Sequence, residues 1–200
     1  MVHTVPGPRP APRLRAGDPY RGWRQWYEDG LGWATARGPG GEPQLLTGLR
    51  FDVLDLPAEA GLAVLGRGAR TGPVALEGRR MRLLVAAGAA EELPGLLDWL
   101  EWRGIPLDLS ATGAGGLVAA PAPAGAAGRS PVMPREAAVW LRPPEPGRRV
   151  EPTLPVTGLG RTGSGSERSA PDLVRLVDSV ATACHRVRLR RGAAQPLAFS

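Results

Sequence analysis

The chain has 200 residues, which is enough for one domain with a hydrophobic core and flanking segments. Its 25 basic residues are all arginine, and the net charge of +6 permits contact with polyanions without requiring it. The single cysteine excludes an intramolecular disulfide, one cysteine and two histidines cannot form a zinc cluster, and no apolar run approaches the ~20 residues of a membrane span.

These features predict a cytoplasmic protein that does not contact a membrane. A lone cysteine fits a reducing compartment, and residues 1–15 lack the apolar stretch of a secretory signal. The chain has no lysine and no asparagine and is rich in Ala, Gly and Pro. This composition is typical of the codon usage of a high-GC bacterium, so the missing lysine says little about function.

Composition divides the chain into five parts. Residues 1–19 are rich in Pro and Arg without periodicity and predict a disordered tail. Residues 20–142 hold the periodic segments of a domain, and residues 143–169 predict a linker because they are rich in Gly, Pro, Ser and Arg. An amphipathic helix is predicted at residues 170–190, followed by a tail at residues 191–200.

An aromatic segment opens the predicted domain. Trp23, Trp26 and Tyr27 recur at i, i+3 and i+4, so a short helix can carry them on one face. With Arg21 and Arg24 this face could stack the bases of a single strand. The favoured interpretation is a helix that packs its aromatic face on a sheet.

A strand at residues 49–56 follows a turn at Thr47-Gly48. Asp52 and Asp55 lie three positions apart on it, so alternation directs them to opposite faces. Asp55 is the better candidate for a ligand site because it lies at the C-terminal end of the strand, where ligands of α/β sheets collect.

The next predicted elements are one helix and two strands, at residues 58–67, 73–76 and 81–85. Arg80 and Arg82 alternate with apolar residues and therefore share one face. Two interpretations stay open for this pair. The planar guanidinium groups could bind phosphate in bidentate fashion, or they could form a solvated sheet face beside Glu77.

A helix and a hairpin are predicted in the middle of the chain. Residues 91–103 carry leucines at i, i+3, i+4 and i+7. Residues 105–123 predict a strand that holds Asp108, a glycine turn and a second strand that prolines end. An acid there can hold a metal or form a turn, and the matching acid Asp55 favours the metal. An edge strand is predicted at residues 137–141.

The final helix is predicted at residues 171–188. Apolar side chains form one stripe over four turns: Leu173, Leu176, Val177, Val180, Cys184 and Val187. The stripe packs either on this domain or on a partner protein. Cys184 lies on the stripe and is typical of an inert core thiol. His185 points in another direction, which argues against a catalytic Cys–His pair.

The motifs LTG, LDLP, GRRMRLLV and PLDLSATGAGGLVAAPAP, in this order and spacing, resemble the prim-pol domain. This is the N-terminal domain of bifunctional DNA primase/polymerases in the archaeo-eukaryotic primase superfamily. The resemblance extends over about residues 23–140. It implies an α/β (α+β) fold with a mixed β-sheet and flanking helices, nucleotide or nucleic acid as partner, and Mg²⁺ or Mn²⁺ as cofactor.

The resemblance also implies roles for individual residues. Asp55 and Asp108 match acids of the family pattern and would be the catalytic and metal-binding positions. Arg79, Arg80 and Arg82 lie on the strand that the family places over its site, and would bind nucleotide phosphates.

The chain departs from the family pattern at two positions. Pro57 stands where the pattern has a second acid of the pair, and Arg80 or Met81 stands where it has a histidine. Transfer of a nucleotide by two metal ions needs several carboxylates, because each ion takes about six oxygen ligands. Asp55 and Asp108 could hold at most one ion, and loosely, so the polymerase site is predicted to be degraded.

Three functions follow as hypotheses. The first is a prim-pol-like domain that binds nucleotide or nucleic acid without efficient polymerase activity. The second is a non-catalytic interaction or regulatory module on the same fold, with the C-terminal helix as the element that docks a protein partner. The third is an active primase/polymerase, which would need replacements for the missing acid and histidine.

Overall fold

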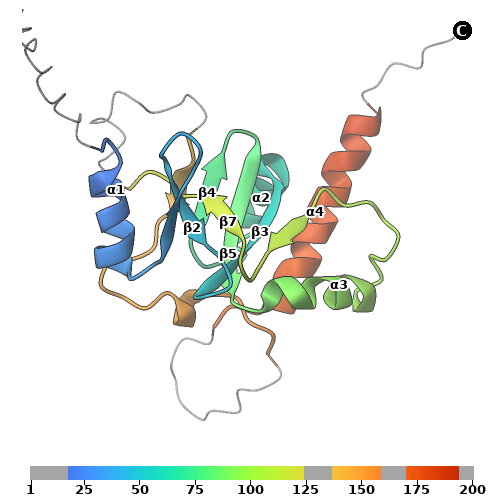
Figure 1. The fold of residues 1–200 in the computed structure, drawn as a ribbon. Coiled ribbons are helices and arrows are strands. Elements are labelled where there is room, and N and C mark those ends of the chain that lie inside the picture. Colours follow the sequence, from blue (N-terminus) through green and yellow to red (C-terminus); the bar gives the residue numbers. More distant parts are fainter. Residues whose placement is uncertain (1–17, 124–136, 159–169, 194–200) are drawn as a thin grey trace, which may run out of the picture.

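The computed structural model describes residues 18–123, 137–158 and 170–193, which form an α+β fold in three layers (Figure 1). The central layer is a five-stranded sheet with antiparallel pairing between all its described strands. Its strand order is β6 (Ser110–Thr112), β3 (Phe51–Pro57), β5 (Arg80–Ala86), β4 (Val74–Glu77) and β8 (Val139–Arg142). The α/β class is confirmed, but the predicted mixed sheet is wrong because the neighbours in this sheet run antiparallel.

A second sheet has three short strands: β1 (Thr35–Arg37), β2 (Pro43–Leu46) and β7 (Leu117–Ala119). The sequence did not predict β1 and β2. The hairpin predicted at residues 105–123 is wrong, because β6 pairs with β3 whereas β7 pairs with β2 in the other sheet. The turn around Gly115, which has a φ of 73°, therefore carries the chain from one sheet to the other.

One face of the five-stranded sheet is covered by three helices, α2 (Ala58–Gly66), α3 (Ala89–Trp99) and α4 (Leu173–Ala193) (Figure 1). Alternation along β3 and β5 supplies the sheet side of this core, with Leu54, Leu56, Met81, Leu83 and Val85. The close approach of α2 depends on Gly61, since a Cβ there would lie 2.1 Å from Sδ of Met81.

The apolar stripe of α4 packs on this domain. Its members are buried in the core shared with α2 and α3. The helix is also fixed by polar contacts, since Arg188 donates to the carbonyl of Pro106 at 2.8 Å and Arg190 lies 3.0 Å from Glu59. Of the two alternatives for the stripe, packing on this domain is therefore confirmed, and the docking of a protein partner by the C-terminal helix stays a prediction. The helix also continues to Ala193, into the segment predicted as a tail.

The cysteine on α4 behaves as the sequence predicts. Cys184 is 1% exposed, and burial raises the pKa of its thiol to about 12. The reactive thiolate form is therefore scarce at neutral pH.

The other face of the sheet is covered by the three-stranded sheet and an aromatic layer. Here α1 (Arg21–Gln25) continues into a π-helical turn (Trp26–Leu31). Tyr27 is fully buried, donates its hydroxyl to the carbonyl of Pro121 at 2.5 Å and accepts a hydrogen bond from Nε1 of Trp140 at 3.0 Å. The packing interpretation of the aromatic segment is thus confirmed for Tyr27.

The predicted linker is ordered in its first part. Val150 and Leu154 are buried in the aromatic layer on either side of a 3₁₀ turn (Glu151–Thr153), and Val156 bridges to Asp172. A linker from residue 143 is therefore wrong for residues 143–158. Parts of three predicted segments lie outside the described residues: residues 1–17 of the tail predicted at 1–19, residues 159–169 of the linker predicted at 143–169, and residues 194–200 of the tail predicted at 191–200.

Within the described ranges, no helix combines the length and the apolar character that crossing a membrane requires.

The burial of α4 leads to a prediction for stability. We expect Leu176→Ala to lower the free energy of unfolding by about 2–5 kcal/mol, because Leu176 is 3% exposed and its loss leaves a cavity in the core. Leu189→Ala, on the same helix at 59% exposure, is the matched control and should change stability little. Urea unfolding measures both. Equal effects of the two substitutions would contradict the packing of α4 on this domain.

Candidate functional site

The candidate acids and arginines gather on the sheet face that lies opposite the three helices. On β3, Asp55 alternates with Leu54 and Leu56, which enter the helical core. On β5, Arg82 lies directly across from Asp55 in the antiparallel register, and Arg80 follows on the same face. The predicted common face of Arg80 and Arg82 is confirmed.

Arg80 joins the two acids that the sequence singled out. Its Nε donates to Oδ1 of Asp55 at 2.5 Å, and its Nη1 donates to Oδ1 of Asp108 at 2.6 Å. Asp108 comes from the loop before β6, so its placement on a strand is wrong. Asp55 and Asp108 therefore converge as predicted, and the group that both of them bind is the guanidinium of Arg80.

Arg82 and Glu77 complete this group. Arg82 Nε lies 3.2 Å from Oδ2 of Asp55, and its Nη2 lies 2.5 Å from Oε2 of Glu77. We call these five residues, Asp55, Glu77, Arg80, Arg82 and Asp108, the ionic cluster. With three carboxylates and two guanidinium groups, the ionic cluster is close to neutral. A third guanidinium group, that of Arg191, lies outside the cluster with its Nη1 3.9 Å from Oδ2 of Asp108.

The electrostatics of the ionic cluster hold Arg80 in its charged form. Burial lowers the pKa of the Arg80 guanidinium, but the hydrogen bonds with Asp108 and Asp55 outweigh burial, so the pKa is raised. The side chain of Arg80 is 33% exposed, and that of Asp55 is 19% exposed. Both charges are thus partly shielded from water, and each depends on the other for compensation.

The ionic cluster does not fit the divalent metal that the family resemblance implies. In residues 18–123, 137–158 and 170–193, no three His, Cys, Asp or Glu side chains are grouped so that they could hold an ion. Asp55 and Asp108 direct oxygens at Arg80, the position from which an ion would have to bind both. A metal could bridge the two acids only after displacing Arg80.

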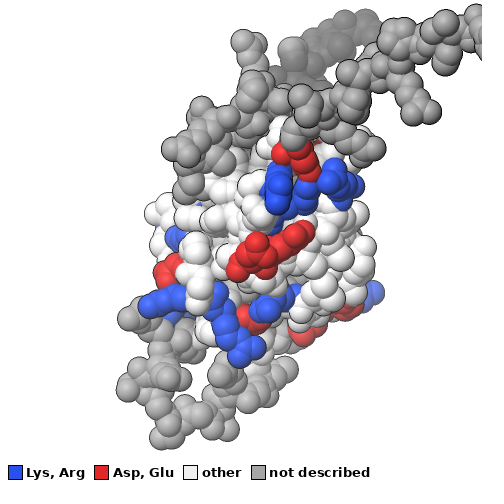
Figure 2. All heavy atoms as spheres, turned by 60° about the vertical axis from the view of Figure 1, so that its left-hand side comes forward, with Lys and Arg blue, Asp and Glu red and all other residues white. Residues whose placement is uncertain are grey.

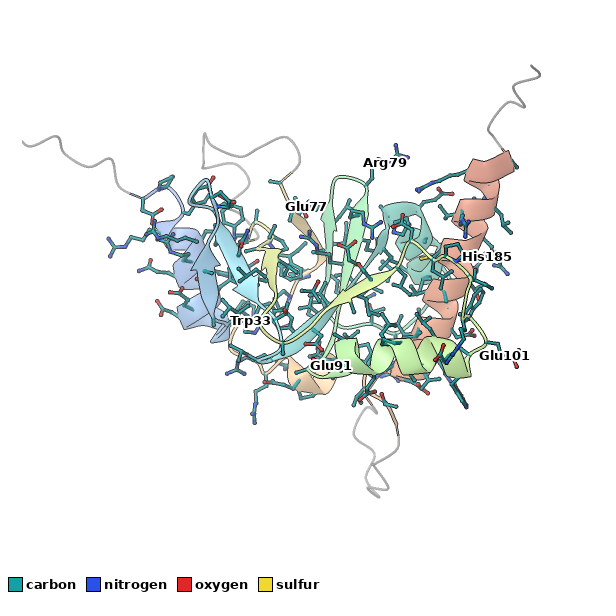
Figure 3. The ribbon with its side chains drawn as sticks, turned by 45° about the vertical axis from the view of Figure 1, so that its right-hand side comes forward. Trp33, Glu77, Arg79, Glu91, Glu101 and His185 are labelled. Atoms are coloured by element: carbon teal, nitrogen blue, oxygen red, sulfur yellow. The ribbon has the colours of Figure 1, made fainter. Side chains whose placement is uncertain are left out.

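Arg79 is not part of the ionic cluster. It lies at the tip of the β4–β5 hairpin, next to Gly78 with a φ of 53°, and Figure 3 shows its side chain projecting away from the body of the domain. Its carbonyl accepts a hydrogen bond from the N–H of Ala58 at 2.8 Å, which fixes the hairpin tip at the start of α2. Among the described residues Arg79 has no carboxylate partner.

Asp52 lies on the opposite face of β3 and stabilises α3. The N-cap residue of α3, Gly88, has no side chain with which to bond the free N–H groups of the first turn. Asp52 supplies that bond from β3: its Oδ2 accepts hydrogen bonds from the N–H groups of Gly88 and Ala90, both at 2.9 Å. The prediction that alternation separates Asp52 from Asp55 is confirmed.

Burial disfavours the charged form of Asp52. The residue is fully buried and its Oδ1 has no hydrogen-bond partner. Burial raises the pKa of Asp52, and the hydrogen bonds from Ala90 and Gly88 only partly oppose this. The glycine before the helix is the signal in the sequence that could have indicated this role.

The charges on the face over α1 and the small sheet do not form one basic surface. Figure 2 shows basic and acidic side chains in separate groups there, with uncharged surface between them. Ion pairs account for part of this pattern, since Asp18 binds Arg24 and Arg37 and Glu151 lies 2.8 Å from Arg50. Among the described residues on this face, Figure 2 therefore shows no continuous basic track that could follow a nucleic acid backbone.

Comparison of the chain with protein-family models, with curated proteins and with solved structures finds no match. The prim-pol resemblance therefore stays a prediction.

The pKa of Asp52 leads to a pH-dependence prediction. The pKa of Asp52 is higher in the folded than in the unfolded protein, so between these two values the folded state keeps the carboxyl protonated while the unfolded state loses the proton. The free energy of unfolding therefore falls as pH rises from 3.8 through the folded pKa. Asp52→Asn keeps an oxygen acceptor for α3 without this charge. We expect its stability relative to the unsubstituted protein to rise across that pH range, measured by urea unfolding.

A second substitution at this position is the control. Asp52→Ala removes the acceptor as well as the charge, so it should lower the free energy of unfolding by about 1–3 kcal/mol at neutral pH. An Asn variant as unstable as the Ala variant, or one whose relative stability does not change with pH, would contradict the capping role of Asp52.

The position of Arg80 leads to a prediction for metal binding. Arg80→Ala frees one oxygen of Asp55 and one of Asp108, so we expect Mn²⁺ to bind at least about tenfold more tightly than in the unsubstituted protein. Electron paramagnetic resonance of free Mn²⁺ measures this. Arg175→Ala, at 89% side-chain exposure on α4, is the control. Equal Mn²⁺ affinity in all three proteins would show that Arg80 does not block a metal.

Proposed function

We propose that the chain is a divergent DNA primase/polymerase-like domain that binds the phosphates of nucleotides or nucleic acid without efficient polymerase activity. The observation that supports it is the convergence of Asp55 and Asp108 on Arg80. These acids come from segments far apart in the sequence, and they are the two that the family resemblance selects.

The same contacts argue against catalysis. Nucleotidyl transfer by two metal ions needs carboxylates that are free to bind both ions. Here Asp55 is bound by Arg80 and Arg82, and Asp108 by Arg80. Pro57, at the position of the second family acid, has no carboxylate to add. The third hypothesis, an active polymerase, therefore has the least support.

Phosphate binding is assigned first to Arg79. Its guanidinium is exposed at the hairpin tip and has no carboxylate partner among the described residues. Arg80 and Arg82 lie behind it and can contact phosphate only by giving up carboxylates of the ionic cluster. Binding should therefore be weak and should depend strongly on salt concentration.

The interaction module with α4 as its docking element has less support than phosphate binding. The stripe that would have docked a partner is covered by α2, α3 and the sheet. The outward side of α4 is polar, with Arg175 and Asp178 among its exposed residues.

Titration of a labelled single-stranded oligonucleotide, followed by fluorescence anisotropy, tests the proposal. We expect saturable binding at low salt that weakens as salt rises, and a loss of about three- to tenfold in Arg79→Gln, because one phosphate contact is removed. Arg175→Gln, an exposed arginine on α4, is the matched control and should bind as the unsubstituted protein does.

Two outcomes would overturn the proposal. Absence of binding at low salt would remove the phosphate-binding function. Primer synthesis with Mn²⁺ that is lost in Asp108→Asn would show that the chain is an active polymerase.

A further inference from the structure

A hollow lies at the end of β4 that is remote from the ionic cluster. Val74 at this end pairs with Arg142 of β8, whereas Glu77 at the other end belongs to the cluster. The hollow has a volume of about 630 Å³ and is lined by Thr71, Arg142 and the segment that follows β8. This volume is in the range of sites for small molecules.

Arg142 is held in position at this hollow. Its Nη1 donates to Oγ1 of Thr71 at 2.6 Å and to the carbonyl of Thr71 at 3.1 Å. Thr71 is 9% exposed, and the next residue, Gly72, is packed so closely that a Cβ there would lie 2.9 Å from Leu154. The anchor of Arg142 is therefore a rigid part of the fold.

Arg142 is the uncompensated charge of the hollow. Within the described part of the chain no carboxylate lies within ion-pair distance of it. The two acids nearby have other partners, since Glu145 lies 3.1 Å from Arg148 and Glu151 lies 2.8 Å from Arg50. With Nη1 bound to Thr71, Nε and Nη2 of Arg142 are left for an anion.

The remaining lining combines a second cation, the ion pair of Glu145 with Arg148, and an apolar wall. Arg149 lies at the rim with 84% of its side chain exposed, and its nearest carboxylate, Glu151, is 3.9 Å away. The wall is formed largely by prolines, among them Pro73, Pro144 and Pro152. A ligand that suits the second cation and the wall carries an anionic group at one end and an apolar body at the other.

We propose that this hollow binds an organic phosphate, with its phosphate on Arg142 and Arg149 and its apolar body against the prolines. The planar fork of arginine matches phosphate oxygens in bidentate geometry. Prolines offer flat apolar surface to a ring such as a nucleobase. The site is separate from the ionic cluster and from Arg79, so it goes beyond the proposed function.

Titration of the full chain with AMP, followed by calorimetry at low salt, tests this site. Adenosine and inorganic phosphate are the two partial probes. We expect AMP to bind, inorganic phosphate to bind more weakly because it lacks the apolar body, and adenosine to bind at least about tenfold more weakly than AMP, because charge-assisted hydrogen bonds are lost.

Substitutions separate this hollow from the other candidate site. We expect Arg142→Gln to weaken AMP binding about tenfold or more. Arg149→Gln should weaken it about threefold, and this exposed side chain can be replaced without effect on folding. Arg175→Gln, an exposed arginine on α4 that belongs to neither candidate site, is the matched control and should leave AMP binding unchanged. Thermal unfolding checks that the Arg142 variant, which loses its bonds to Thr71, remains folded.

Three results would overturn the site in the hollow. The first is equal affinity for AMP and adenosine, and the second is no AMP binding at low salt. The third is AMP binding that is abolished by Arg79→Gln and unchanged by Arg149→Gln. The last result would still support phosphate binding at the hairpin tip, so the two proposals fail independently.

Discussion

Strand alternation along β3 is the constraint on which the arrangement of this domain depends. One face of the strand adds Leu54 and Leu56 to the helical core and directs Asp52 to the first turn of α3. The other face adds Val53 to the aromatic layer and directs Asp55 into the ionic cluster. A shift of one residue in register would exchange these faces and bury Asp55 among the helices without its arginines. The two acids therefore have separate tasks because of their positions alone.

The ionic cluster shows how a guanidinium group can lie between two carboxylates, where a metal ion would otherwise have to bind them. Two carboxylates that approach one another need a positive charge between them, and either a divalent ion or a guanidinium group can supply it. Arg80 supplies it from β5, directly beside β3. The acids remain in place, but their oxygens are already bound. The cluster thus contributes to the structure of this end of the sheet, and the exposed Arg79 is left as the group that can meet an external phosphate.

The sequence predicts local features of this fold well, and features that depend on distant partners poorly. The stripe on α4, the strands around Asp55 and Arg82, and the opposite direction of Asp52 all follow from periodicity. Strands β1 and β2 of the small sheet were missed because strands of three or four residues are too short to show alternation. The false hairpin arose because a glycine turn indicates a change of direction and not which strand is paired next.

The same limit applies to the candidate site. Sequence reasoning selected Asp55 and Asp108 together, through the order of motifs, but no local signal tells which acid a guanidinium will bind. The C-terminal position of Asp55 was used as an argument for a ligand site, and that rule concerns parallel strands, whereas both neighbours of β3 are antiparallel. Val150 and Leu154 are isolated apolar residues in a Pro- and Gly-rich segment, so their burial could not be predicted.

The position of α4 has a consequence for how the protein reaches this structure during synthesis. The helix lies near the end of the described chain and packs against α2, more than half the chain earlier. Until the ribosome has released residues up to Val187, the helix-facing side of the sheet lacks its largest cover. Contacts of such high sequence separation form slowly, and exposed apolar surface favours association of incomplete chains. This domain is therefore expected to complete its fold only after α4 has emerged, and the uncovered face of the sheet is open to association until then.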